Sequence, residues 1–248
     1  MQQTQAQTNP SQVVTGMGAM GILIIGDEGT GKTASLRTLP PENTLIVQPN
    51  TKDLSWGGWQ KSYNLGENLI RVKTLNETIT AMGAAYQSLE AQGKKIKYIV
   101  VEDVTHLQNE RTTSQSFINQ NSGNAAFAKW NQFGADFSRL ISEIPKVLPA
   151  HVTLIYVGHV ESKEDGTVSM QTAGKLLDNS IKVPSYFTYV LHSRVLKGEN
   201  DVIQRVFQTN FDGVYKAKTP MGCFDDLYIP NDMKAVVDRI QQYKLENK

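Results

Sequence analysis

The residues with the clearest chemistry form one run near the N-terminus, Gly26-Asp27-Glu28-Gly29-Thr30-Gly31-Lys32-Thr33. Glycines, a lysine and a hydroxyl at this spacing are typical of a phosphate-binding loop, or P-loop. The glycines let backbone N–H groups approach phosphate oxygens, the lysine reaches the β- and γ-phosphates, and the Thr33 hydroxyl is a ligand for Mg²⁺. Together with Ala34, the run predicts a site for ATP and Mg²⁺.

A P-loop needs a second acidic group beside the metal, usually at the end of a neighbouring apolar strand. Glu102 and Asp103 follow the apolar run Tyr98–Val101 and meet this requirement. Glu102 occupies the position at which the metal-orienting acid is expected. Asp103 is the alternative ligand, or polarises the attacking water, and one of the two acids could instead cap the segment that begins at Thr105. The sequence leaves these alternatives open.

These residues must be positioned by regular elements, and the chain alternates between short β-rich runs and helical segments. The alternation predicts an α/β fold with a mainly parallel central sheet, flanked by helices, and antiparallel C-terminal strands. The expected strands are 20–25, 44–48, 69–72, 98–101 and 152–157, followed by an antiparallel pair at 187–196 and 202–208. The expected helices are 32–39, 75–90, 125–147 and 233–243, and a hairpin turn is expected at 163–166.

Length and composition limit the class of protein. The 248 residues are enough for one substantial core, and we expect one ATPase domain over residues 17–248 after a polar, disordered leader at 1–16. The net charge of +1 gives no global basic field, so any contact with DNA must come from local loops. No apolar run approaches the roughly 20 residues that span a bilayer. The single Cys223 excludes an internal disulfide and fits a reducing cytoplasm.

Three segments together resemble one known family. Gly26–Thr33, Tyr98–Leu107 and Leu154–His159 are similar to the RecA-like core of phage nucleotide-binding proteins, and in particular to Sak-type single-strand annealing ATPases. The resemblance covers residues 17–243. It implies a RecA-like P-loop ATPase that acts in DNA recombination, single-strand annealing or replication. It also implies the cytoplasm of a phage-infected bacterium as the location, and phage replication or recombination proteins as partners.

The resemblance further implies roles for single residues. His159 matches the γ-phosphate sensor at the end of a core strand, and as a sensor it completes a catalytic set of Lys32, Glu102, Asp103 and His159. The alternative is a histidine that caps the end of the strand through a backbone hydrogen bond. Two departures bear on turnover. The family usually carries aspartate where Glu102 stands, and the segment 46–56 contains no glutamate where recombinases usually place a catalytic one. We therefore expect the protein to bind ATP but to hydrolyse it slowly.

The loops at 108–124 and 160–175 lie where RecA-like proteins contact single-stranded DNA. The first contains Arg111 and Phe117, and the second contains Lys163 and Lys175. Such residues supply phosphate contacts and a stacking platform. Because acidic neighbours dilute the positive charge, the expectation of DNA binding rests on the resemblance.

The segment Lys216–Gly222 is similar to a motif of RecA-like ATPases whose basic residues enter the nucleotide site of a neighbouring subunit. Lys218 and Gly222 match this motif, whereas Pro220 stands where its arginine would be. If Lys216 or Lys218 acts in trans, the active form is a homo-oligomer with heterologous contacts. The alternative is a surface turn with two solvated lysines.

Three functions compete on this basis. The leading one is an ATPase that acts on single-stranded DNA. The second is a nucleotide-dependent switch or assembly protein that hydrolyses ATP weakly and binds a protein partner. A small-molecule kinase ranks last, because the sequence shows no arginine-rich lid. The aromatic residues Trp56, Trp59 and Tyr63 are interpreted as a satellite core rather than as a base-stacking loop.

Overall fold

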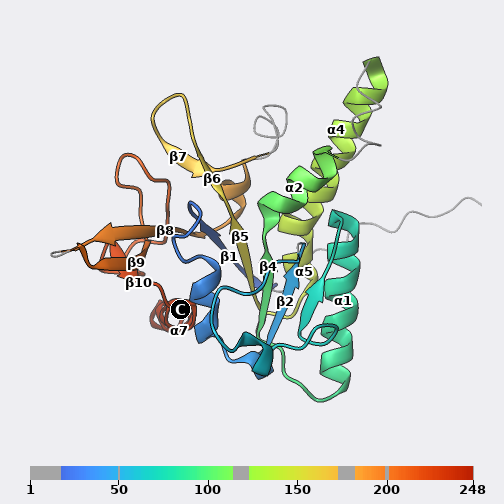
Figure 1. Ribbon diagram of the computed structural model, residues 1–248, viewed down its shortest axis with the longest axis horizontal. Helices are drawn as coiled ribbons and strands as arrows, with labels where there is room; N and C mark the ends of the chain where they lie inside the picture. The colour runs from blue at the N-terminus through green and yellow to red at the C-terminus, as the bar shows by residue number, and fades with distance from the viewer. Residues whose placement is uncertain (1–17, 50, 114–122, 173–181, 199–200, 248) are drawn as a thin grey trace, which may run out of the picture.

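The computed structural model describes residues 18–49, 51–113, 123–172, 182–198 and 201–247, so the expected leader at 1–16 lies outside the described part of the chain. The centre of the molecule is an eight-stranded sheet in the order β10-β9-β8-β1-β5-β4-β2-β3 (Figure 1). Its strands are β1 (Met20–Ile25), β2 (Thr44–Gln48), β3 (Leu69–Arg71), β4 (Tyr98–Glu102), β5 (Thr153–Gly158), β8 (Tyr189–Lys197), β9 (Ile203–Gln208) and β10 (Tyr228–Pro230).

Parallel pairing dominates this sheet. β1 pairs in parallel with β5 and β8, and β4 pairs in parallel with β5 and β2. Beyond β8 the order continues through β9 and β10, and both of these pairings are antiparallel. The predicted fold class is therefore confirmed: a mainly parallel α/β sheet that ends in antiparallel C-terminal strands.

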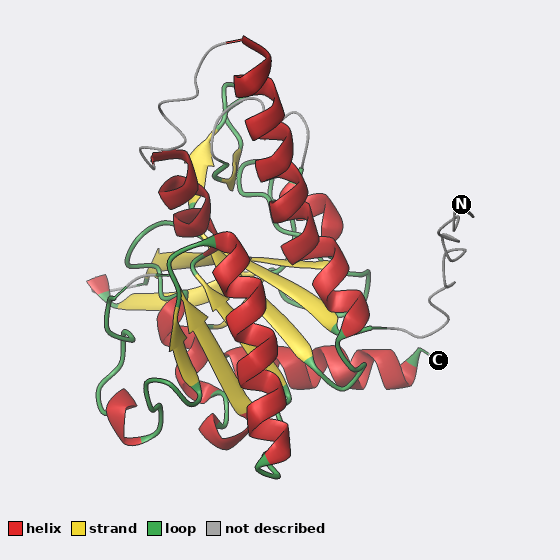
Figure 2. Cartoon of the chain, turned by 90° about the vertical axis from the view of Figure 1, so that its right-hand side faces the viewer, coloured by secondary structure: helices red, strands yellow, loops and turns green. Residues whose placement is uncertain are grey.

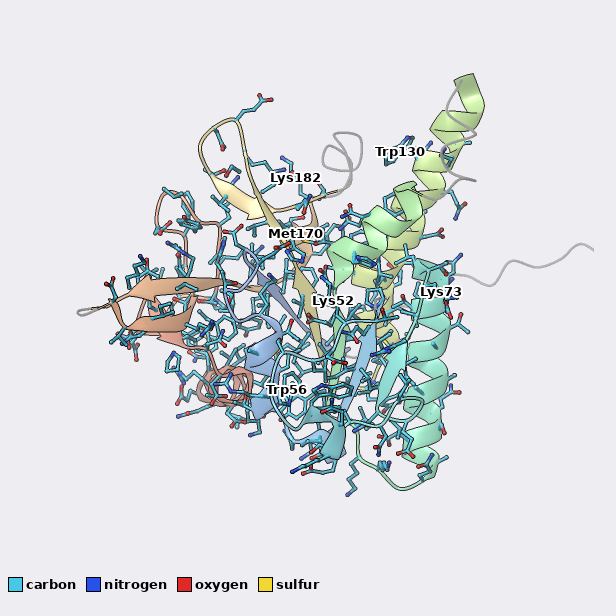
Figure 3. The ribbon with its side chains drawn as sticks, in the orientation of Figure 1. Lys52, Trp56, Lys73, Trp130, Met170 and Lys182 are labelled. Carbon is cyan, nitrogen blue, oxygen red and sulfur yellow. The ribbon has the colours of Figure 1, made fainter. Side chains whose placement is uncertain are left out.

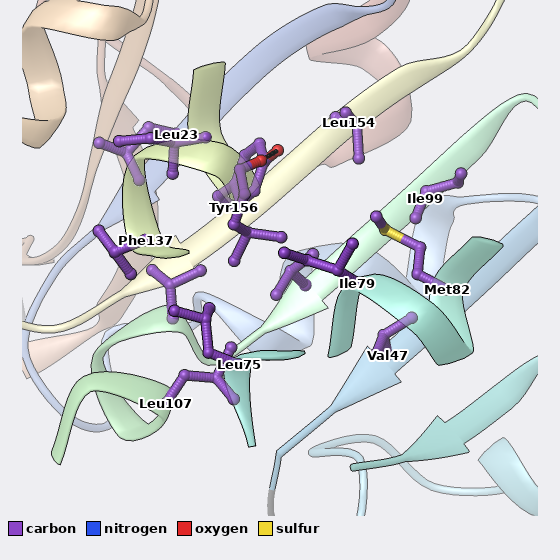
Figure 4. Packing of buried hydrophobic residues seen from close by; sticks show 14 of the residues in the cluster. Leu23, Val47, Leu75, Ile79, Met82, Ile99, Leu107, Phe137, Leu154 and Tyr156 are labelled. Atoms are coloured by element: carbon purple, nitrogen blue, oxygen red, sulfur yellow. Dashed lines mark hydrogen bonds between the residues drawn. The ribbon is translucent and has the colours of Figure 1, made fainter. Parts of the chain in front are cut away.

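Both faces of the sheet are buried, which is why its central strands read as continuous apolar runs. In β1, Leu23 and Ile25 belong to one core cluster (Figure 4), whereas Ile22 and Ile24 belong to the other. Helices cover both faces, with α1 and α7 on opposite sides (Figures 1 and 2). The first cluster includes residues of α1 (Leu75–Ala91), α2 (Val104–Thr113), α4 (Gly123–Ser138) and η4 (Arg139–Glu143), and α5 (Ile144–Val147) packs against it through Ile144. The second cluster includes residues of η1 (Thr33–Thr38) and α7 (Met233–Glu246).

The predicted helix at 125–147 is instead three consecutive pieces, α4, the π-helical turn η4 and α5. Pro145 has no N–H to donate to the carbonyl four residues earlier, so a regular α-helical ladder cannot run through this point. The hydroxyl of the fully buried Tyr156 donates to the carbonyl of Leu140, 2.8 Å away, and so satisfies a backbone group of the widened turn. The structure thus corrects the prediction of one uninterrupted helix.

The predicted helix at 32–39 forms as the 3₁₀ helix η1. The Ser35 hydroxyl donates to the Lys32 carbonyl, and the Thr38 hydroxyl donates to the Ser35 carbonyl. Such local bonds from hydroxyl side chains to the carbonyl three residues earlier favour the tighter turn over a long α-helix. Further short 3₁₀ turns are η2 (Pro41–Asn43), η3 (Trp59–Lys61) and η5 (Val183–Tyr186).

A small hairpin follows β5 and projects from the sheet (Figure 1). Its strands are β6 (Val160–Ser162) and β7 (Val168–Met170), which pair in antiparallel. Gly166, at a φ of 79°, donates its N–H to the carbonyl of Lys163 and closes the turn that the sequence predicts. Each helix in the described segments is too short or too polar to span a bilayer.

Candidate nucleotide-binding site

The P-loop joins the carboxyl end of β1 to η1, and close packing explains two of its glycines. A Cβ on Gly26 would lie 2.6 Å from the backbone oxygen of Ser193 in β8. Gly31 has a φ of 102°, and a Cβ there would lie 2.8 Å from the Cδ of Arg205 in β9. The loop is therefore pressed against β8 and β9, and only glycine fits at these positions without displacing its neighbours.

The ammonium group of Lys32 lies inside the curve of this loop. Its Nζ donates to the carbonyls of Gly26 and Asp27, each at 2.8 Å, and the residue is buried. Burial lowers the pKa of Lys32, and the carboxylates of Glu102 and Asp103 oppose this shift. The result is a cation held by neutral carbonyls, at the point where a phosphate-binding loop needs positive charge.

Thr33 and Glu102 meet across two elements, η1 and the end of β4. The Thr33 hydroxyl donates to Oε1 of Glu102, while the buried Oε2 of Glu102 has no hydrogen-bond partner within the described part of the chain. Burial raises the pKa of Glu102 to about 7, although the bond from Thr33 opposes this. A hydroxyl and an incompletely satisfied carboxylate are oxygen ligands of the kind that Mg²⁺ prefers, alongside water and phosphate oxygens. These residues fit the expected metal.

Asp103 points to a different set of partners. Its Oδ1 accepts from the backbone N–H groups of Thr105 and His106, at 2.7 and 3.1 Å, at the start of α2. Its Oδ2 lies 2.8 Å from Nε2 of His159, the residue that follows β5. Burial alone would raise the pKa of Asp103, but the bonds from His159 and from the two backbone groups outweigh burial and lower it. Adjacent acids thus face different groups, Glu102 toward Thr33 and Asp103 toward His159.

Two cavities flank these residues. One of about 810 Å³ is lined by P-loop and η1 residues and by residues of three other segments: Gly29, Gly31, Lys32, Thr33, Ala34, Arg37, Ser55, Trp56, Arg205, Pro230, Asn231 and Asp232. The other, of about 530 Å³, is lined by Asp27, Glu28, Lys52, Asp103, Thr105, His106, Asn109, His159, Val160 and Gln171. The P-loop therefore has open space on both sides.

A family model described as an AAA domain matches residues 19–221 of the sequence. The chain belongs to this family of P-loop ATPases. A solved structure described as a prototypical ATPase from the type III secretion system of pathogenic bacteria is similar at a TM-score of 0.43 and 12% identity. The match covers 71% of this chain and 51% of that one, so the AAA chain spans about half the length of that structure. No curated protein matches the sequence.

Sequence reasoning missed several residues that line the cavities of this AAA domain. Trp56 packs edge-on against Tyr63 at 5.9 Å, and Tyr63 belongs to the second core cluster, so these aromatics extend a main core rather than form the expected satellite core; Trp56 also lines the larger cavity. Lys52 lines the smaller one, on the same segment after β2 (Figure 3). The position of Lys52 and Trp56 after β2 could have marked them, since loops at the carboxyl ends of parallel strands form binding sites. No comparable signal marks Arg205, which lies on an antiparallel strand remote in sequence.

The lysines expected to act in trans lie outside both cavities of their own chain. The backbone N–H of Lys216 donates to Val168 of β7, and that of Lys218 donates to Val190 of β8. The side chain of Lys218 is exposed, whereas Lys216 is half-buried. These bonds hold the segment against the hairpin and the sheet and leave Lys218 facing outward.

The loops expected to contact DNA are only partly described. Phe117 and Lys175 lie outside the described residues, as does the side chain of Arg111. In the hairpin, Nζ of Lys163 lies 2.8 Å from a carboxylate oxygen of Glu161. This ion pair offsets the positive charge of Lys163, as the acidic neighbours in the sequence indicate.

Proposed function

We propose that this AAA domain binds ATP with Mg²⁺ and hydrolyses it. The observation that carries the proposal is the convergence of Lys32, Thr33 and Glu102. Lys32 and Thr33 lie where the loop after β1 enters η1, and Glu102 ends β4. β5 lies between those two strands, and His159 directly follows it. Three neighbouring parallel strands thus direct their carboxyl ends at one place, which is where ligands bind in open α/β sheets.

The geometry favours a division of labour among these residues. Lys32 binds the β- and γ-phosphates, while Thr33 and Glu102 hold Mg²⁺, which when bound neutralises charge that develops on the phosphates. Asp103 orients the attacking water, and His159 contacts the γ-phosphate and reports its presence to Asp103. Gly26, Asp27, Glu28, Gly29, Thr30, Gly31 and Ala34 form the rest of the phosphate cradle. This assignment gives the metal role to Glu102 and the water role to Asp103.

Lys32→Ala is the direct test of this site. Lys32 makes its bonds to loop carbonyls and not to the core clusters, so the variant should fold while its phosphate release falls to background. Release of phosphate from ATP and Mg²⁺ would be measured for both proteins, with circular dichroism to check the fold. Turnover equal to that of the wild type would refute the assignment.

We further propose that turnover is coupled to single-stranded DNA, in recombination, annealing or replication of phage type within the host cytoplasm. The support is the resemblance, together with the place of the smaller cavity beside α2 and the β6–β7 hairpin. With ATP bound, the segments 108–124 and 160–175 would contact the strand, and hydrolysis would release it. We expect poly(dT) to raise phosphate release by the wild type. A protein that binds ATP but is unaffected by poly(dT) would contradict this coupling.

One observation favours the alternative, a nucleotide-dependent switch that hydrolyses ATP slowly and binds a protein partner such as a phage replication or recombination protein. Both oxygens of Asp103 already have partners, since Oδ1 accepts two backbone N–H groups and Oδ2 faces His159. A carboxylate so engaged is a poor proton acceptor. Tight ATP binding with very slow, DNA-independent release of phosphate would support the switch.

A further inference from the structure

Arg205 extends from the middle of β9 onto the P-loop. Its Nε donates to the carbonyl of Gly29 at 3.3 Å, and its Cδ occupies the space that a Cβ on Gly31 would need. The side chain is exposed and lines the larger cavity beside Thr33 and Ala34. A cation from a remote strand therefore lies against the same loop that surrounds Lys32.

The two cations share one arrangement. Lys32 is held by the carbonyls of Gly26 and Asp27, and Arg205 is held by the carbonyl of Gly29. A guanidinium has five N–H donors, so the bond from Nε leaves further donors to offer. Bonds between a guanidinium and a phosphate are charge-assisted and stronger than bonds to a neutral carbonyl. A phosphate in the loop would therefore attract both side chains from their carbonyl partners.

The strand that carries Arg205 is fixed relative to the loop. β9 pairs with β8, where Val195 lies opposite Arg205. In β8 the Ser193 hydroxyl donates to the carbonyl of Thr30 at 2.9 Å, which ties this part of the sheet to the P-loop. The neighbouring Arg37 lines the same cavity, and its Nη1 donates to two carbonyls, those of Ala34 at 2.6 Å and Asn231 at 3.4 Å. The position of Arg205 thus follows from sheet register rather than from a mobile loop.

We propose that Arg205 is a second phosphate-contacting cation of the site, and that it acts in cis, on the nucleotide bound by its own chain. The ligand group is the polyphosphate of a nucleoside triphosphate. The inference rests on the ATP site proposed above and adds a residue that the P-loop pattern does not contain. Under this proposal the nucleotide site receives positive charge from two chains: Arg205 comes from the chain that binds the nucleotide, and Lys218 comes from a neighbouring subunit.

Affinity measurements test the contact. A fluorescent ATP analogue would be titrated into the wild type, Arg205→Ala, Arg205→Lys and the control Arg139→Ala, which removes an exposed arginine from η4, a turn that packs with the first core cluster. We expect Arg205→Ala to weaken binding roughly tenfold or more, Arg205→Lys to weaken it less, and Arg139→Ala to leave it unchanged. Competition by adenosine, which has no phosphate, should be unaffected. Equal losses for adenosine and ATP, or no loss for ATP, would overturn the proposal.

Mixing experiments test whether Arg205 acts on the nucleotide bound by its own chain. Arg205→Ala would be mixed with Lys32→Ala, whose own site is inactive but whose Arg205 is intact. If Arg205 acts within its own chain, phosphate release by the mixture equals the average of the separate proteins. Recovery above that average would show action in trans and refute the proposal. If Lys32→Ala itself keeps full turnover, the ATP site fails; if it is inactive while Arg205→Ala matches the wild type in affinity and turnover, only the role of Arg205 fails.

Discussion

Adjacent carboxylates in this protein have opposite pKa shifts. Burial beside the Thr33 hydroxyl raises the pKa of Glu102 to about 7, whereas hydrogen bonds from His159 and from backbone groups lower the pKa of Asp103 despite burial. Because one acid is costly to ionise and the other is held ionised, their roles differ although they are neighbours in sequence. The sequence places both acids beside the nucleotide but cannot separate them, since partners decide the shifts.

Glu102 makes stability depend on pH. A carboxyl whose pKa is about 7 in the folded protein and near 4.5 when unfolded stabilises the fold below pH 4.5, and this contribution is lost as pH rises through 7. Glu102→Gln removes the ionisation, so we expect the variant to gain stability relative to the wild type between pH 4.5 and 7.5, by up to about 3 kcal/mol. Urea unfolding at each pH measures this. The exposed Asp53→Asn is the control, and a constant difference between Glu102→Gln and wild type would contradict the expectation.

At the scale of elements, the sequence predicts the parallel strands well because burial on both faces leaves continuous apolar runs. Hydrophobic pattern also locates α1 and α7, whose first turns are capped by Thr74 and Asp232. It fails at η1 and η4, where hydroxyl bonds to backbone, Pro145 and the hydroxyl of Tyr156 decide the geometry. Those contacts depend on tertiary neighbours or on competing local bonds, which periodicity does not contain.

Thr105 connects the elements around Asp103. Its hydroxyl accepts the backbone N–H of His159 at 2.8 Å, joining the start of α2 to the end of β5. Thr105→Val leaves that N–H without its partner, so we expect a loss of about 1–3 kcal/mol in the free energy of unfolding and lower turnover. Thr78→Val is the matched control: Thr78 is also buried, but its hydroxyl donates to the Thr74 carbonyl, which already accepts the N–H of Thr78. If urea unfolding gives Thr105→Val and Thr78→Val the same loss in the free energy of unfolding, the special role of the Thr105 hydroxyl is refuted.

Over the whole molecule, strand order decides which distant residues meet. The P-loop strand β1 lies between β5, which leads to His159, and β8, which carries Ser193 and pairs with the strand of Arg205. The motif spacing predicts the β1–β5–β4 side of the site, because each of those strands ends in a residue of recognisable chemistry. The β8–β9 side has no such marker in the sequence. Arg205 lies 176 residues after Gly29, and the antiparallel pairing of β9 with β8 brings the two together. That half of the site follows from topology alone.

The last prediction concerns assembly. Lys218 faces outward and lies outside both cavities of its chain, so a role in catalysis requires a neighbouring subunit. We expect Lys218→Ala to lower phosphate release at least tenfold, and mixing it with Lys32→Ala to restore part of the activity, because the second protein supplies Lys218 to the intact site of the first. Lys216→Ala, which removes a half-buried lysine from the same segment, should retain turnover. Mixing Arg205→Ala with Lys32→Ala should restore no phosphate release. Sedimentation velocity should detect an oligomer of the wild type. A monomer whose Lys218→Ala variant is fully active would refute assembly through this lysine.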